Sequence, residues 1–140
     1  MSTPDLRDLD DDAFVAAIAR CELPAAAFDH LQHLRLAWLH LRQAPLQEAI
    51  ERCCADLARF AAHHGAITKF HRTVTEALLR LMAAGGAADP ALGWPAFLQC
   101  NPALVGDARA LLGHHYSPTL LARPEARTSF QPPDLQPLPA

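Results

Sequence analysis

Apolar residues recur along most of the chain at intervals of three and four, the spacing of one face of an α-helix. Phe14, Ala17 and Ile18 show this spacing first, and Asp10 to Asp12 stand before them as N-cap candidates, so we expect a helix from Ala13 to Cys21. Alanine and leucine are abundant and β-branched residues are few, a composition that favours helices. The pattern predicts an all-α fold.

Caps and glycines bound three longer apolar stretches. Asp29, with a glutamine three residues later, has the pattern of a capping box and predicts a helix over 30–42. Pro45 is expected in the first turn of a helix that stops at Gly65, and another helix is expected over 68–84, before two glycines. Short connections between four such segments are typical of a helical bundle, so we predict four main helices in one domain.

Proline punctuates the C-terminal third of the chain. Five of the prolines there follow a candidate cap and favour a new short helix, the clearest over 102–114. We therefore expect a flexible leader over 1–9, a helical bundle domain over 10–122, and a proline-rich C-terminal extension over 123–140 that docks on the bundle. The expected cap–proline pairs are Asp89-Pro90, Trp94-Pro95, Asn101-Pro102, Ser117-Pro118 and Arg123-Pro124.

Composition narrows the classes of function. With 140 residues, 51% of them hydrophobic, the chain can bury a core of its own. A net charge of -3 lacks the basic excess that non-specific nucleic-acid binding needs, so no nucleic acid is expected. The sequence has no basic stretch leading into an apolar one, as in a signal peptide, and no run of about 20 apolar residues, as in a membrane-spanning helix. We therefore predict a cytoplasmic protein that is not associated with membranes. The four cysteines form no C-x-x-C pair and are expected to be reduced.

The most informative stretch is F-D-H-L-Q-H-L-R-L-A-W, over 28–38. His30 and His33 are three apart in the first turn of the expected helix and share a face with His40, beside a second stripe of leucines and tryptophan. A helix with two such stripes should be largely buried, two or three of its imidazoles with it. His71 follows on a later helix, so we predict that His30, His33 and His71 converge.

Three neutral imidazoles from two helices can hold zinc, iron or copper and leave a position open for water or substrate. Catalysis, through the metal or through His30 or His33 as a general base near neutral pH, would then rest on these three residues. We add Thr73, Thr75 and Tyr116 as cofactor-binding or substrate-binding candidates. The alternative is that each histidine is a satisfied core or capping residue, because H-x-x-H without a following carboxylate is a weak motif.

Three stretches together resemble a group of small bacterial all-helical proteins of unassigned function. They are the 28–42 segment, K-F-H-R-T-V-T over 69–75, and the segment from Y-S-P at 116 to P-D-L-Q-P-L-P at 139. The resemblance implies that the family's histidines fall on His30, His33 and His71, and that the C-terminal tail is ordered. Where the family pattern usually has tyrosines, this chain has His40 and Phe70, which weakens those two positions as candidates.

The resemblance brings no established activity, so three functions stay open. The first is a histidine-lined pocket that binds a metal and acts on a small molecule. The second is a module that binds or senses a small molecule without turning it over. The third is a subunit that docks a protein partner through Trp94, Phe97 and the proline-rich tail, and a homodimer is also left open.

Overall fold

The structure is a computed structural model of the chain, and it describes residues 9–139. Residues 1–8 of the expected leader lie outside this range. Within it every regular element is a helix and no strand occurs, which confirms the all-α class. Over the same residues no helix is both apolar enough and long enough to cross a lipid bilayer.

The described residues form nine α-helices and two short 3-10 helices. The α-helices are α1 (Asp11–Ala19), α2 (His30–Gln43), α3 (Leu46–His63), α4 (Arg72–Ala84), α5 (Trp94–Cys100), α6 (Pro102–Gly106), α7 (Ala108–Gly113), α8 (Pro118–Leu121) and α9 (Pro124–Thr128). The 3-10 helices are η2 (Ala25–Ala27) and η3 (Ile67–Lys69).

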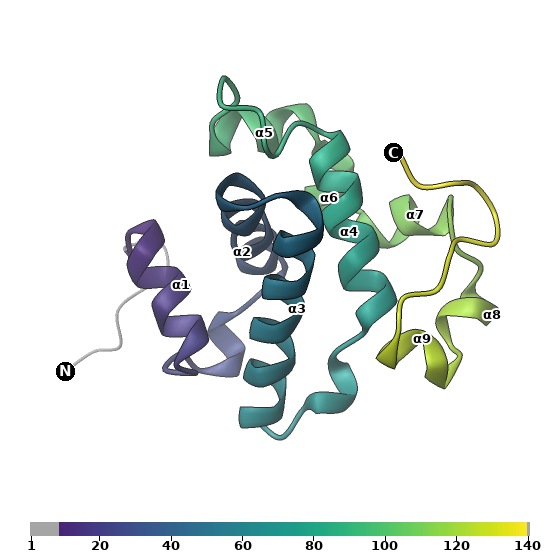
Figure 1. The fold of residues 1–140 in the computed structure, drawn as a ribbon, viewed down its shortest axis with the longest axis horizontal. Coiled ribbons are helices and arrows are strands. Elements are labelled where there is room, and N and C mark those ends of the chain that lie inside the picture. Colours follow the sequence, from purple (N-terminus) through teal and green to yellow (C-terminus); the bar gives the residue numbers. More distant parts are fainter. Residues whose placement is uncertain (1–8, 140) are drawn as a thin grey trace.

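Three long helices, α2, α3 and α4, pack against one another at the centre of the molecule (Figure 1). Helix α1 lies against α3 on one flank, whereas α7 and α9 pack against α4 on the other. The core between them is apolar because each long helix turns its leucines, isoleucines and aromatic residues inward. Its fully buried large side chains include Phe14, Ile18, Leu34, Leu36, Ile50, Leu79, Met82, Phe97 and Tyr116.

Local sequence signals set most helix boundaries. The Asp10 carboxylate accepts a hydrogen bond from the N–H of Ala13, and the Asp29 carboxylate accepts one from Gln32, so both predicted N-caps are confirmed. Gly65, just beyond α3, has a φ of +68°, a left-handed conformation in which glycine carries no steric penalty.

Two expected helices are interrupted. Helix α4 begins at Arg72, four residues later than predicted, because η3 is followed by extended backbone at Phe70 and His71. The expected helix over 102–114 divides into α6 and α7 at Asp107, whose carboxylate accepts a hydrogen bond from the N–H of Ala110 and caps α7. Periodicity alone does not mark such breaks, because the apolar spacing continues across them.

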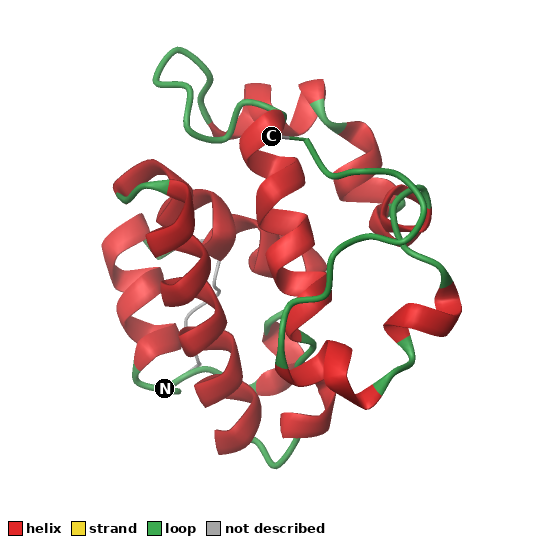
Figure 2. Cartoon of the chain, turned by 45° about the vertical axis from the view of Figure 1, so that its right-hand side comes forward, coloured by secondary structure: helices red, strands yellow, loops and turns green. Residues whose placement is uncertain are grey.

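The C-terminal tail runs across the molecule (Figure 2), and side chains of the body form hydrogen bonds with it. The Thr73 hydroxyl donates to the carbonyl of Ala126 at 2.7 Å and accepts from the N–H of Gln131 at 3.1 Å. The Tyr116 hydroxyl donates to the carbonyl of Gln131 at 2.8 Å, and Asp134 accepts from the Ser117 hydroxyl at 2.6 Å. Buried hydroxyls thus replace the hydrogen bonds that a proline-rich segment cannot make with itself.

Candidate functional site

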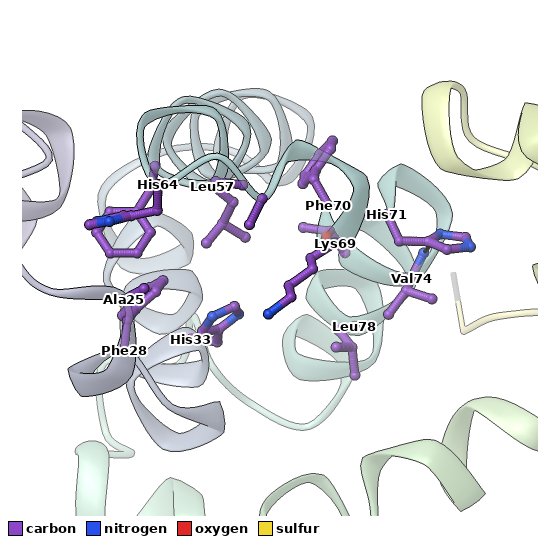
Figure 3. Close-up of a pocket in the computed structure, with 14 residues that line it drawn as sticks. Ala25, Phe28, His33, Leu57, His64, Lys69, Phe70, His71, Val74 and Leu78 are labelled. Carbon is purple, nitrogen blue, oxygen red and sulfur yellow. Dashed lines mark hydrogen bonds between the residues drawn. The ribbon is translucent and has the colours of Figure 1, made fainter.

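A pocket of about 350 Å³ opens between α2, α3 and the segment that leads into α4 (Figure 3). Most of its wall is apolar or aromatic, with a few polar side chains among the apolar ones. No aspartate or glutamate is among its lining residues. The polar residues of the wall are His33, His64, Lys69, His71 and Thr75, and the aromatic ones are Phe28, Phe60 and Phe70.

His33 is the predicted residue that faces this pocket most directly. Its ring stacks on Phe28, with the ring centroids 4.2 Å apart, and forms no hydrogen bond with the described residues. Solvent reaches the ring through the pocket, but the protein around it replaces much of its hydration. Desolvation, followed by repulsion from His30, lowers the pKa of His33 to about 4, while the Asp29 charge opposes this shift. His33 is therefore uncharged at neutral pH.

A smaller cavity of about 60 Å³ adjoins the pocket towards the core. The two hollows share the side chains of His33, Leu57, Thr75 and Leu78, which lie between them. The Thr75 hydroxyl forms no hydrogen bond with the described part of the chain, so it can bond to a ligand at this junction. Of the three predicted hydroxyl residues, Thr75 alone lines a described pocket.

The other two hydroxyl candidates, Thr73 and Tyr116, serve the tail. Thr73 is fully buried and Tyr116 is 1% exposed, and both hydroxyls bond to main-chain groups of the C-terminal extension. A ligand would have to displace the tail to reach either of them. Thr73 and Tyr116 lie close to histidines in the sequence, but they hold the tail and have no role in the pocket.

His30 and His71 each bond to a main-chain carbonyl from another part of the chain. The ring Nε2 of His30 donates to Leu104 at 2.8 Å, which ties α2 to α6. His71 donates from Nε2 to Leu121 at 2.8 Å and accepts from the N–H of Val74 at Nδ1, as the N-cap of α4. Both nitrogens of His71 are thus engaged, and its ring points away from His33 (Figure 3).

Within residues 9–139 the three predicted histidines therefore do not line one common cavity, but each of two hollows is lined by two of them. His33 and His71 line the outer pocket, and His30 and His33 line the inner cavity. In the part of the chain that the structure describes, no three His, Cys, Asp or Glu side chains are placed to hold a metal ion together. A metal bound by all three rings would require His71 to free one of its two engaged nitrogens, either Nδ1 from the N-cap bond or Nε2 from the bond to Leu121.

Burial along α2 also differs from the expectation. His40 is buried and bonds to Asp56 of α3 through Nε2 at 2.8 Å, whereas His30 and His33 are exposed. Leu31, on the predicted apolar stripe, is 38% exposed. His30, Leu31 and His33 in the first turn are thus accessible, whereas residues 36–41 of the same helix are all buried.

Sequence reasoning missed Lys69, the last residue of η3. Its side chain extends across the pocket towards His33 (Figure 3), and its ammonium group forms no ion pair with the described residues. Lys69 is the single lysine of the chain, and the other basic residues are all arginine. The presence of a single lysine among eleven arginines is the sequence signal that could have identified Lys69.

His64, the residue that follows α3, also belongs to the pocket. Its Nε2 donates to the carbonyl of Leu23 at 2.9 Å, and its ring packs on Phe60 with centroids 4.5 Å apart. The histidine thus joins the end of α3 to the segment before α2. It closes one side of the pocket without offering its Nε2 to a ligand.

The residues expected to dock a protein partner are largely covered. Phe97 is fully buried, and Trp94 packs on both Phe97 and Trp38. The proline-rich tail bonds to the body of the same molecule.

Comparisons with protein-family models, curated proteins and solved structures find no match. The pocket is therefore the feature from which a function is best argued.

Proposed function

We propose that this protein binds a small organic molecule in the pocket around His33. Small-molecule sites in proteins are concave, mostly apolar and at least about 300 Å³ in volume, with a few polar groups that fix the orientation of the ligand. The pocket beside α2 has these properties, and at His33, Thr75 and Lys69 it offers polar groups that the described residues leave without side-chain partners. The convergence of these three side chains on one apolar hollow is the observation that carries the proposal.

Binding without turnover fits His33 better than general-base catalysis does. An efficient base has a pKa close to the operating pH, because proton transfer needs both the free base and a driving force. The pKa of His33 is about 4, so the ring is free at neutral pH but weakly basic. A step that needs the uncharged ring would titrate near pH 4 instead of near neutral pH. His33 is better suited to donate or accept a hydrogen bond.

The zinc, iron or copper ion stays a prediction, and the binding proposal does not depend on it. Of the three predicted ligands, His33 alone keeps both ring nitrogens without a hydrogen bond to the described residues. A metal at this position would need donors from the small molecule itself.

A matched pair of alanine substitutions tests the proposal. Ala61 lines the pocket, whereas the adjacent Ala62 on α3 is exposed and lies outside it. A library of small organic fragments would be screened against the protein by two-dimensional NMR of its backbone amides. We expect hits that shift the amide signals of His33 and Thr75. A61F should abolish their binding because its side chain fills the pocket, whereas A62F should leave their binding unchanged.

Two results would overturn the proposal. One is the absence of any saturable hit up to millimolar fragment concentrations. The other is a set of hits that A61F does not weaken although NMR spectra show that this variant is folded. Either result would mean that the hollow beside His33 is a packing defect and no binding site.

A further inference from the structure

We infer that the ligand is a small organic carboxylate with an apolar body, and that its carboxylate binds Lys69 and His33. This inference rests on the proposed function and specifies the chemical class of the ligand. It follows from the charges around the pocket, from the hydrogen-bonding groups that face it, and from the composition of its wall.

The pocket carries a positive charge that the described protein leaves uncompensated. Lys69 lies in its wall without an ion pair to the described residues, and no carboxylate lines the hollow. The Arg127 guanidinium donates to the carbonyl of Thr68 at 2.6 Å but is not among the lining residues, so Lys69 is the cation of this wall. The Asp29 carboxylate is engaged at the N-terminus of α2, where it caps the helix. An anion would find a compensating charge here that a neutral or cationic molecule would not use.

The charge count favours a single negative charge on the ligand. His33 is uncharged at neutral pH, so it adds a hydrogen-bond donor but no second positive charge. His71 and His64 already donate their Nε2 protons to Leu121 and Leu23. One ammonium group and one neutral imidazole match a monocarboxylate, whereas a phosphate dianion would keep part of its charge unpaired.

The remaining wall favours an apolar body. Phe60, Phe70 and Leu57 face the hollow, and the adjoining cavity is lined largely by aliphatic side chains and the Cys53 thiol. Burial in apolar surroundings raises the pKa of Cys53, so its thiol stays protonated and adds no charge. An aryl or alkyl group bound there would leave water for apolar contacts, while the carboxylate stays near the pocket opening.

Three probes with the same apolar body test the inference, namely 4-phenylbutyrate, its neutral amide and 4-phenylbutylamine. Calorimetry at neutral pH would measure the affinity of each for the full chain. We expect the acid to bind about tenfold or more tightly than the amide, the gain typical of a charge-assisted hydrogen bond, and the amine to bind most weakly.

The single lysine allows a direct check of location. Reductive methylation with ¹³C-formaldehyde labels only Lys69 and the N-terminal amine and preserves both charges. Addition of the acid should shift the Lys69 methyl signal at saturating concentrations and leave the signal of the N-terminal amine in place. A shift of the N-terminal signal alone would overturn the inference.

Charge variants separate this inference from the proposed function. K69M should reduce the affinity for the acid to that for the amide, K69R should retain most of the difference, and R109M should have no effect, because Arg109 is an exposed cation outside the pocket. If acid and amide bind equally while A61F abolishes both, the pocket stands and the carboxylate class is wrong. If none of the three probes binds, the inference falls, and the fragment screen decides separately on the pocket.

Discussion

The imidazole of His33 lies against the phenyl ring of Phe28, with centroids 4.2 Å apart and planes 29° apart. Phe28 in turn packs edge-on against Phe60 of α3, so the histidine is the outermost member of an aromatic group that reaches into the core. This stacking holds the imidazole at the pocket wall without using either of its nitrogens. The arrangement explains how a ring can be fixed in place, partly desolvated and still open to a ligand.

The lowered pKa of His33 should make stability depend on acid. The usual pKa is 6.5 and that of the folded protein is about 4, so between these values the unfolded chain binds a proton that the folded chain does not. The free energy of unfolding should therefore fall as the pH drops from about 6.5 to about 4. Urea unfolding at pH 7, 5.5 and 4 would measure this decline, and H33Q should show a smaller decline than the unaltered protein.

Asp29 provides the control for this assignment. Its charge raises the pKa of His33, whereas its side chain also caps α2. D29N keeps a good N-cap residue and removes the charge, so it should lower the pKa of His33 further with little loss of helix stability. An NMR titration of the His33 ring proton checks this, and an unchanged or raised pKa would contradict the account.

The Thr73 hydroxyl should determine whether the C-terminal tail stays attached. T73V preserves the shape of the side chain but removes its bonds to Ala126 and Gln131, and it should lower the free energy of unfolding by about 1–3 kcal/mol. Faster hydrogen exchange at the Gln131 amide would show that the loss is local to the tail. T75V is the matched control, since the Thr75 hydroxyl has no side-chain hydrogen bond with the described residues, and it should change stability little while it weakens ligand binding.

Glu76 is a buried carboxylate held between two arginines of the same helix. Each of Arg72 and Arg80 donates to one of its oxygens at 2.9 Å, and Glu76 is only 3% exposed. E76Q should destabilise the protein by about 3 kcal/mol, because Arg80 loses its partly buried ion pair and Arg72 keeps only the exposed Glu51 as a partner. Thermal and urea unfolding would measure the loss.

The exposed pair of Glu48 and Arg52 on α3 serves as the comparison for Glu76. Its side chains are about half exposed, so E48Q should change the free energy of unfolding by less than about 0.5 kcal/mol. Equal losses in E48Q and E76Q would show that the burial of Glu76 does not strengthen its ion pairs.

Several features follow from the sequence because they depend on neighbouring residues. The helical class, the caps at Asp10 and Asp29, and the stop at Gly65 are set within one or two turns of the chain, where side chain and main chain meet directly. The sequence also indicates His33 as a candidate, since it lies in the first turn of a helix that starts at a recognisable cap.

Tertiary packing decides what each candidate faces, and no local pattern contains that information. His71 caps α4 and bonds to Leu121, fifty residues later in the chain, whereas Lys69 two residues before it reaches into the pocket. Thr73 and Thr75 share a motif, yet one holds the tail and the other lines the hollow. The sequence by itself determined the helices and the types of polar groups. Long-range packing determined which of these groups kept free hydrogen-bonding atoms, because a buried polar group bonds to the main chain that is packed against it.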